Sequence, residues 1–281
     1  MPSPVDEVTA WRLLRAVVPQ APGELVTTTT PHNASCHAPL QIDERENWTL
    51  PGPVSDAAKD LLDLYLPLQL SSDLIIGQIG QSVDGRIATE SGHSHYVTGP
   101  EDRIRLHRLR AIVDAVVVGA GTVESDDPQL TVRHVDGPSP VRVVLDPNGR
   151  VSRDRTIFHD GIARTLTVRR NPNPAEPPTM DGEDLWLPHD GEKGFAPDVL
   201  IAALRDQGLR RLLVEGGGVT VSRFLQARCL NRLHVTIAPL LIGSGRPALA
   251  LPPIATLGQA LRPPYRLFRL GHDVLFDLDL R

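Results

Sequence analysis

The chain is poor in the residues that hold small secreted or metal-bound domains together. Cys36 and Cys229 are its two cysteines, which excludes a disulfide framework and a four-cysteine zinc site. Both are expected to be free thiols. No segment approaches the roughly 18 uninterrupted apolar residues of a membrane span, and the first residues lack the apolar core of a signal peptide. We therefore expect a cytoplasmic protein with no membrane partner.

An excess of positive charge is also missing. The chain has 29 Lys and Arg against 34 Asp and Glu, a net charge of −5, and no basic block long enough to follow a phosphate backbone. This excludes nucleic acid as an expected partner. At 281 residues with 41% hydrophobic content, the chain is long enough to bury a sizeable core.

Residues 1–70 differ from the rest and are interpreted as an N-terminal extension of unknown role, partly helical. Residues 8–18 and 55–66 have helical apolar spacing, the second with Ser55 placed to cap it and Pro67 just past its end. Trp11 and Trp48 are natural anchors for packing against the main domain or a partner subunit.

A cluster in this extension offers metal-ligand side chains. His32, Cys36 and His37 lie close together in sequence, but no second pair of ligands is nearby. A polar loop is the favoured interpretation, so we expect no bound metal.

Residues 71–281 alternate strand-like and helix-like segments, which predicts an α/β domain with a mostly parallel sheet. The last strand alternates with acids, as an antiparallel edge strand would. A stretch rich in proline and acid, from Asn171 to Gly182, is expected to be a mobile surface loop. The expected strands are 74–80, 115–119, 141–145, 233–238, 265–270 and 274–280.

A helix is predicted to begin at Thr98-Gly99-Pro100-Glu101, a capping box with an early proline. Its expected buried side carries Leu106, Leu109, Ile112 and Val113. Its arginines, at positions 103, 105, 108 and 110, are expected to form mostly a solvated face.

The stretch around which the domain is organised runs from Arg210 to Leu225. Three apolar residues end in Glu215 and three glycines, and apolar residues then resume at helical spacing, which predicts strand, tight turn and helix. Glycines let a ligand approach the backbone, and the first helical N–H groups attract anions, so the turn could cradle a phosphate. A glycine-rich turn without a ligand fits the pattern equally well.

A second turn follows the strand 115–119. Ala120-Gly121-Thr122 stands at its carboxyl end, where ligands bind in open α/β sheets, and residues 124–133 then place carboxylates and an arginine on one loop. Taken alone, Asp126-Asp127-Pro128 is more typical of an ordinary turn.

These residues carry a resemblance to a known family. The string SVDGRIATESGHSHYVTGPEDRIRLHRLRAIVDAVVVGAGTVESDDPQLTVR, together with LLVEGGGVTVSRFLQARCLNRLHVTIAPLLIGSG, resembles the reductase domain of bacterial riboflavin biosynthesis. That domain is the carboxyl-terminal half of a bifunctional deaminase/reductase and has a dihydrofolate-reductase-like fold. The resemblance covers residues 72–281 and leaves the first 70 residues unmatched.

The resemblance implies an NADPH-dependent reduction that opens the ribose of a ribosylaminopyrimidine 5′-phosphate to a ribityl chain by hydride delivery to C1′. It implies a phosphorylated pyrimidine as small-molecule substrate, and we expect a homodimer. Glu215 and Asp126 are the catalytic candidates, and arginines suit a substrate phosphate because the guanidinium binds it bidentately. The implied cofactor positions are Gly80, Tyr96, Thr122, Asp126, Gly217, Gly218, Val219, Thr220, Val221, Ser222 and Arg223, and the implied substrate positions are Ser94, Arg110, Leu130, Arg133 and Glu215.

The chain departs from the family pattern in two ways. It has neither the HxE nor the PCxxC motif of the zinc deaminase. Tyr96 stands where the family often has tryptophan. Arg150 is a candidate partner for the 2′-phosphate of NADPH, with a solvated surface arginine as the alternative.

Three functions remain open from the sequence. The leading one is the riboflavin-pathway reductase. The second is a related NADPH reductase acting on dihydrofolate or a pterin-like substrate. The third belongs to another class, a non-catalytic nucleotide-binding module whose extension recruits a partner.

Overall fold

The chain divides into two units, residues 1–73 and 74–281, in the computed structural model. The structure describes residues 4–18, 26–28, 40–173, 175–189, 191 and 194–281. No helix in this part of the chain has the length and apolar character needed to cross a membrane.

The first unit combines two helices with a small antiparallel sheet. The helices are α1 (Glu7–Arg15) and α2 (Asp56–Gln69), and the strands are β1 (Val26–Thr28), β2 (Leu40–Ile42) and β3 (Trp48–Thr49). Each helix begins at a short polar residue whose side chain accepts a hydrogen bond from a backbone N–H of the first turn. The Asp6 carboxylate accepts a hydrogen bond from the Thr9 N–H at 2.8 Å, and the Ser55 hydroxyl accepts one from the Ala58 N–H at 3.2 Å.

Two expectations for this unit need correction. Helix α2 continues through Pro67 to Gln69, because Leu66 and Leu68 on either side of the proline are fully buried and their packing outweighs the lost hydrogen bond. Trp11 is buried inside the unit, with its ring centroid 5.7 Å from that of Tyr65, so it is not a surface anchor. The cluster His32, Cys36 and His37 lies outside the described residues.

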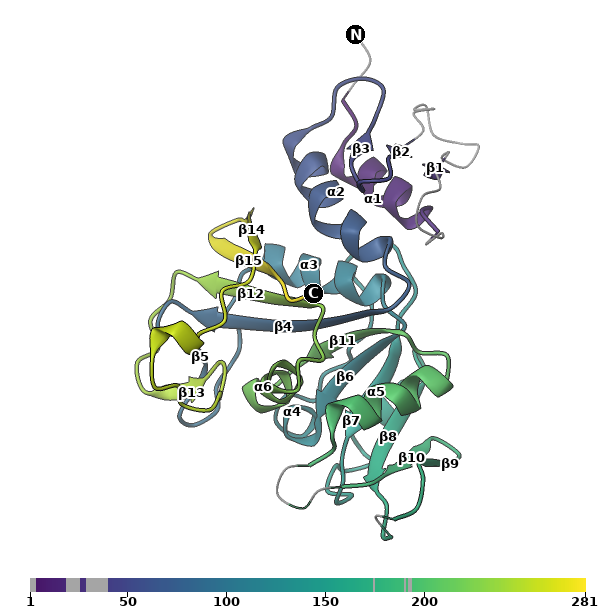
Figure 1. Ribbon diagram of the computed structural model, residues 1–281, viewed down its shortest axis with the longest axis vertical. Coiled ribbons are helices and arrows are strands. Elements are labelled where there is room, and N and C mark those ends of the chain that lie inside the picture. The colour runs from purple at the N-terminus through teal and green to yellow at the C-terminus, as the bar shows by residue number, and fades with distance from the viewer. Residues whose placement is uncertain (1–3, 19–25, 29–39, 174, 190, 192–193) are drawn as a thin grey trace. The chain divides into compact units, whose positions relative to one another are not determined.

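The second unit is built on a ten-stranded sheet with the order β14-β15-β12-β4-β11-β6-β7-β8-β10-β9 (Figure 1). Six of its nine neighbouring pairs are parallel, and the C-terminal strands are antiparallel, which confirms the predicted α/β class. The strands are β4 (Leu74–Ser82), β6 (Ala115–Gly119), β7 (Val141–Leu145), β8 (Thr165–Arg170), β9 (Thr179–Asp181), β10 (Asp184–Leu187), β11 (Arg211–Glu215), β12 (Arg232–Ala238), β14 (Tyr265–Leu270) and β15 (Asp273–Asp279). A separate two-stranded sheet pairs β5 (Arg86–Thr89) with β13 (Gly245–Pro247).

Helices cover both faces of the large sheet. Helices α5 (Pro197–Asp206) and α6 (Gly218–Gln226) pack on one face, where Leu200, Leu204 and Phe224 join Ile75 and Ile79 in the main core. Helix α4 (Ala120–Asp126) contributes to a second core on the other face, with α3 (Pro100–Ala111) anchored near it by polar contacts. Because parallel strands share one carboxyl edge, this arrangement gathers the loops that follow β4, β6, β7 and β11.

The edge strand of the sheet is not the last strand of the chain, as expected, but the strand before it. Strand β15 runs between β12 and β14, so β14 is the edge. The alternating acids that suggested an exposed edge point inward instead. Asp277 is fully buried, 3.3 Å from Arg232 and 2.8 Å from Arg266. The acid-rich stretch 171–182 is also not entirely loop, since it contains β9.

Helix α3 begins and packs differently from the prediction. Gly99 is its N-cap and makes no side-chain capping bond; the Gly99 N–H instead donates to Asp273 Oδ2 at 2.6 Å. Leu109, Ile112 and Val113 are buried as expected, but Arg105 and Arg110 are buried too. The arginines of α3 are therefore not mostly a solvated face, because two of them find polar partners beneath the helix.

Candidate active site

A cavity of about 790 Å³ opens at the carboxyl edge of the large sheet. Its walls come from β4 and from the segments that follow β6, β7 and β11, with further residues from the β5–β13 sheet and from α5 and the residues before it. A volume of this size accommodates a ligand of cofactor size, and the edge is the usual ligand position in open α/β sheets.

The glycine turn between β11 and α6 forms one wall of the cavity. Gly216 and Gly217 adopt φ values of +109° and +52°, which side chains rarely tolerate. A β-carbon on Gly216 would lie 2.9 Å from the Thr122 hydroxyl, and one on Gly218 would overlap the carbonyl oxygen of Ala248. The three glycines thus serve two purposes: the first two set the turn, and Gly218 lets α6 approach residues 247–248.

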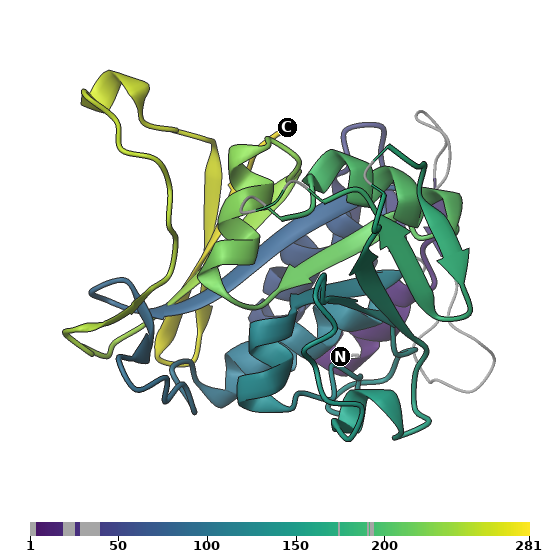
Figure 2. The same ribbon diagram turned by 90° about the horizontal axis from the view of Figure 1, so that it is seen from below.

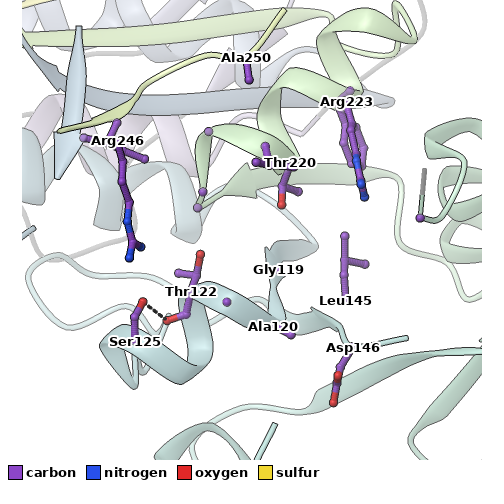
Figure 3. Close-up of a pocket in the computed structure, with 18 of the residues that line it drawn as sticks. Gly119, Ala120, Thr122, Ser125, Leu145, Asp146, Thr220, Arg223, Arg246 and Ala250 are labelled. Atoms are coloured by element: carbon purple, nitrogen blue, oxygen red, sulfur yellow. Dashed lines mark hydrogen bonds between the residues drawn. The ribbon is translucent and has the colours of Figure 1, made fainter. Parts of the chain in front are cut away.

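Helix α4 faces this turn across the cavity. Figure 3 shows Thr122 directed toward the space below Thr220, with Gly119 and Ala120 beside it. Asp126 lines the cavity and is exposed, whereas Asp127 turns away with φ +39° and accepts hydrogen bonds from the Thr156 backbone and hydroxyl at 2.9 and 2.8 Å. The two adjacent aspartates therefore separate into one that faces a ligand space and one that ends the helix.

Three arginines add positive charge to the cavity wall. Arg223 on α6 and Arg246 on β13 extend toward the cavity from the same side in Figure 3. Arg150 lies near Gly121, 3.6 Å from where a β-carbon would stand on that glycine. The neighbouring carboxylate, Asp146, is already engaged, because it accepts from the Arg150 and Val151 N–H groups and pairs with Arg169 at 3.0 Å. The local excess of guanidinium groups favours an anionic ligand.

Glu215, the last residue of β11, is clamped by Arg110 of α3. The Arg110 Nε donates to Oε1 at 2.8 Å and Nη2 to Oε2 at 2.6 Å, a bidentate pair, and Nη1 donates to the Thr131 carbonyl at 3.3 Å. Burial alone would lower the pKa of Arg110, but the Glu215 carboxylate outweighs it and the pKa is raised. The pair fixes the Glu215 carboxylate and, together with the bond to Thr131, uses three of the five N–H donors of Arg110.

Arg133 lies next to this pair. Its Nη1 donates to the Thr131 hydroxyl at 2.7 Å, and its backbone N–H donates to His107 Nδ1 at 3.0 Å. Burial, followed by the charge of Arg110, lowers the pKa of Arg133, and the same effects lower the pKa of His107 to about 3. A neutral His107 therefore accepts a hydrogen bond from the backbone of Arg133, whose guanidinium lies close to a second cation, Arg110. Two neighbouring guanidinium groups favour a bound anion.

The structure brings together many, but not all, of the residues singled out from the sequence. Tyr96 is exposed, with the Arg103 guanidinium 4.5 Å above its ring, and Leu130 is buried in the core beneath α4. Val221 is also a core residue, and the buried Ser222 hydroxyl accepts from the Ala250 N–H. The residues that line the cavity are Gly80, Ser94, Thr122, Asp126, Gly217, Gly218, Val219, Thr220 and Arg223, whereas Tyr96, Arg110, Leu130, Arg133, Glu215, Val221 and Ser222 lie outside its lining.

Arg246 and Gln78 are among the cavity residues that sequence reasoning missed. Arg246 comes directly after the last residue of the second string quoted in the sequence analysis, Gly245. The pairing of β13 with β5 brings it to the cavity. Gln78 is a polar residue inside the apolar run of β4, and that interruption was a usable signal, since a buried polar side chain requires a partner.

Groups that would suit metal or thiol chemistry are not found at this site. Among the described residues, no three His, Cys, Asp or Glu side chains are grouped closely enough to hold a metal ion. Cys229 is a half-buried free thiol, and burial raises its pKa, which makes it a weaker nucleophile.

Comparison with known proteins places these features in a family context. The model of the RibD C-terminal domain matches residues 74–266. The chain is 31% identical over 214 residues to the 2,5-diamino-6-ribosylamino-4(3H)-pyrimidinone 5′-phosphate reductase of Methanothermobacter thermautotrophicus, covering 74% of this chain and 98% of that protein. It is 35% identical over 167 residues to the riboflavin biosynthesis protein RibD of Aquifex aeolicus, covering 59% of this chain but only 46% of that protein.

A solved structure agrees with the sequence matches. The structure of Acinetobacter baumannii RibD superimposes with a TM-score of 0.63 at 25% identity, covering 80% of this chain and 63% of that one. The chain thus spans about half to two thirds of the RibD proteins it matches.

The close approach of α6 to residues 247–248 predicts that a side chain at Gly218 lowers the stability of the fold. Gly218→Ala should lower the melting temperature by several degrees, because the new methyl group would displace the Ala248 and Pro247 carbonyls at a cost of about 1–3 kcal/mol. Gly258→Ala is the matched control, since a β-carbon there meets its nearest atom at 3.7 Å. Equal melting temperatures for the two variants, measured by calorimetry, would show that residues 247–248 are not held against α6.

Proposed function

We propose, since the chain belongs to the RibD C-terminal domain family, that it reduces the ribosyl group of 5-amino-6-(5-phosphoribosylamino)uracil, or a related ribosylaminopyrimidine phosphate, to a ribityl chain with NADPH. The observation that carries this proposal is the cavity shared by the glycine turn and α4 at the carboxyl edge of the sheet. The Arg110–Glu215 pair and Arg133 lie beside that edge.

The residues of the cavity fit a dinucleotide. Gly217, Gly218 and the first turn of α6 would hold the pyrophosphate, because their backbone N–H groups carry the positive end of the helix dipole. Thr122 and Thr220 add hydroxyl donors, and Gly80 lines the cavity on β4, where the nicotinamide would lie. NADPH, when bound, supplies the hydride that reaches C1′ of the substrate.

The chain's own residues would bind the substrate and move the proton. Arg133 binds the 5′-phosphate, since Arg110 is committed to Glu215. Glu215, oriented by that pair, accepts hydrogen bonds from the base or sugar. Opening the ribose requires a proton on the departing ring oxygen as the hydride arrives, and Asp126, the exposed carboxyl group of α4 on the cavity wall, is the group we assign to proton transfer.

A turnover assay tests the function and the cofactor together. The purified protein should oxidise NADPH with the ribosylaminouracil phosphate and not with dihydrofolate, and should use NADPH in preference to NADH. Arg150→Ala should raise KM for NADPH about tenfold or more without changing KM for NADH, because a charge-assisted contact to the 2′-phosphate contributes about 1.5–3 kcal/mol.

The control for this variant is Arg153→Ala, which removes an arginine from the same loop outside the cavity lining. Equal rates with NADPH and NADH at subsaturating concentration would contradict the cofactor preference. Turnover with dihydrofolate alone would favour the related pterin-type reductase, and hydride transfer to any substrate would exclude a non-catalytic module.

Phosphate recognition by Arg133 makes a separate prediction. Arg133→Ala should raise KM for the phosphorylated substrate by a factor corresponding to about 1.5–3 kcal/mol, while the dephosphorylated compound should show the same KM with both proteins. Arg210→Ala is the control, because it removes an exposed arginine at the amino end of β11, the opposite edge of the sheet. An unchanged KM in Arg133→Ala would assign the phosphate to other residues.

We also propose that the chain is located in the cytoplasm, which fractionation of cells would check. We further propose that it forms a homodimer. The edge strand β14 and the segment before it expose Leu257, Leu261, Tyr265 and Leu267, each more than half exposed, and Figure 2 shows that segment extending away from the rest of its unit. An unpaired edge strand with exposed apolar side chains is typical of an interface between subunits.

Sedimentation equilibrium should therefore give twice the monomer mass of 30.6 kDa, and Leu267→Arg should shift the protein toward monomer. Val8→Arg, an equally exposed apolar position in the first unit, is the control. A wild-type protein that sediments as a monomer would remove the proposal.

A further inference from the structure

The segment that carries Arg133 is irregular but held at almost every residue. Residues 127–133 follow α4 without forming a helix or a strand, and Leu130 is buried with a φ of +54°, which side chains rarely adopt. A backbone of this kind cannot satisfy its polar groups within regular structure, so it depends on side chains for partners. Its position is therefore set by the residues that supply those partners.

Four side chains hold the backbone of residues 129–133, and each comes from outside the segment. Two donate to carbonyl oxygens and two accept from N–H groups. Arg142 donates to Gln129 at 3.3 Å and Arg110 to Thr131 at 3.3 Å, while Ser139 accepts from Val132 at 3.1 Å and His107 Nδ1 accepts from Arg133 at 3.0 Å. The hydrogen bond to His107 is the one made at Arg133 itself.

His107 is suited to hold this N–H permanently. It lies on α3 one turn before Arg110, and only 4% of the residue is exposed. Burial, followed by the charges of Arg110, His134 and Arg133, lowers its pKa to about 3 against the opposing effect of the Thr131 carbonyl. At ordinary pH the ring is neutral, and because Nδ1 accepts a hydrogen bond, the proton lies on Nε2.

The contact has a specific task, because Arg133 and Arg110 repel each other. The charge of Arg110 contributes to the lowered pKa of Arg133, which shows that the two guanidinium groups interact unfavourably. Without an anion between them, a mobile segment would move Arg133 away from Arg110. The hydrogen bonds from Arg133 to His107 and to the buried Thr131 hydroxyl oppose that movement.

We propose that His107 is a positioning residue for the substrate phosphate. By accepting from the Arg133 N–H, it holds the Arg133 guanidinium beside Arg110 before substrate arrives, so that binding does not have to order the segment. The inference rests on the proposed function, in which Arg133 binds the 5′-phosphate, and adds a residue of α3 that acts on the substrate only through Arg133.

The test removes the acceptor at His107 and measures phosphate binding directly. His107→Leu should weaken binding of ribose 5-phosphate, followed by calorimetric titration, about five- to tenfold, because one hydrogen bond that orders the site is lost. KM for the ribosylaminouracil phosphate should rise by a similar factor with kcat and the Kd for NADPH unchanged. His107→Asn should restore most of the affinity, since its amide oxygen can accept in place of Nδ1.

A matched control separates positioning from a general loss of stability. The Asn231 side chain accepts from the Ile75 N–H at 2.7 Å, at the amino end of β4 and the opposite edge of the sheet. Asn231→Leu therefore loses the same kind of contact, and it should lower the melting temperature as His107→Leu does while leaving the Kd for ribose 5-phosphate unchanged.

A double variant shows whether His107 acts through Arg133. In an Arg133→Ala protein, His107→Leu should cause no further loss of ribose 5-phosphate binding, because the group that it positions is already absent. The proposal is overturned if His107→Leu keeps the wild-type Kd, if the loss is the same in both backgrounds, or if the wild-type protein does not bind ribose 5-phosphate. The expected binding effects in a protein that does not reduce the pyrimidine would refute the proposed reaction and still support the role of His107.

Discussion

The fit between α3 and the sheet depends on two buried guanidinium groups. An arginine cannot lose its proton at any ordinary pH, so Arg105 and Arg110 can be buried only if each N–H finds an acceptor. The acceptors come from three adjacent strands, with Gln78 on β4, Glu215 on β11 and His234 on β12. The helix is thereby fixed against the same strands whose carboxyl ends form the cavity.

The same requirement extends the polar layer across the sheet. Because Arg105 donates to His234 Nδ1, the proton of the neutral imidazole must sit on Nε2, which lies 3.2 Å from Asp277 Oδ1. Burial lowers the pKa of His234 and keeps it neutral, while the pKa of Asp277 is lowered by His234, Arg232 and Arg266 against the opposing effect of burial. Removing any one member would leave a buried charge or a buried hydrogen-bonding group without its partner. This explains why α3 packs on polar groups on a face of the sheet where apolar packing would be the ordinary solution.

Local patterns predicted the parts of this structure that local chemistry decides. The glycine turn, the buried strand at 115–119 and the cap at Ser55 follow from the conformational preferences of a few adjacent residues, and the structure has all three. The burial of Arg105 and Arg110 could not be predicted this way. Arginines on a helix look the same whether they face water or a partner 105 residues away, as Glu215 is from Arg110. The edge position of β14 and the approach of Arg246 likewise depend on strand pairing, which no single segment specifies.

The two sides of the site consist of different kinds of groups, and this difference affects which sequence changes each side can tolerate. The wall around the glycine turn consists of backbone and small side chains, Gly217, Gly218 and Thr122 among them, which suits a ligand that is read by its phosphates and offers little to discriminate. The side beneath α3 consists of oriented polar groups, which reject a ligand that lacks the matching donors and acceptors by leaving those groups unpaired. On the proposed function, cofactor binding then tolerates sequence change as long as the turn is kept, whereas choice of substrate is tied to the partners that α3 holds in place.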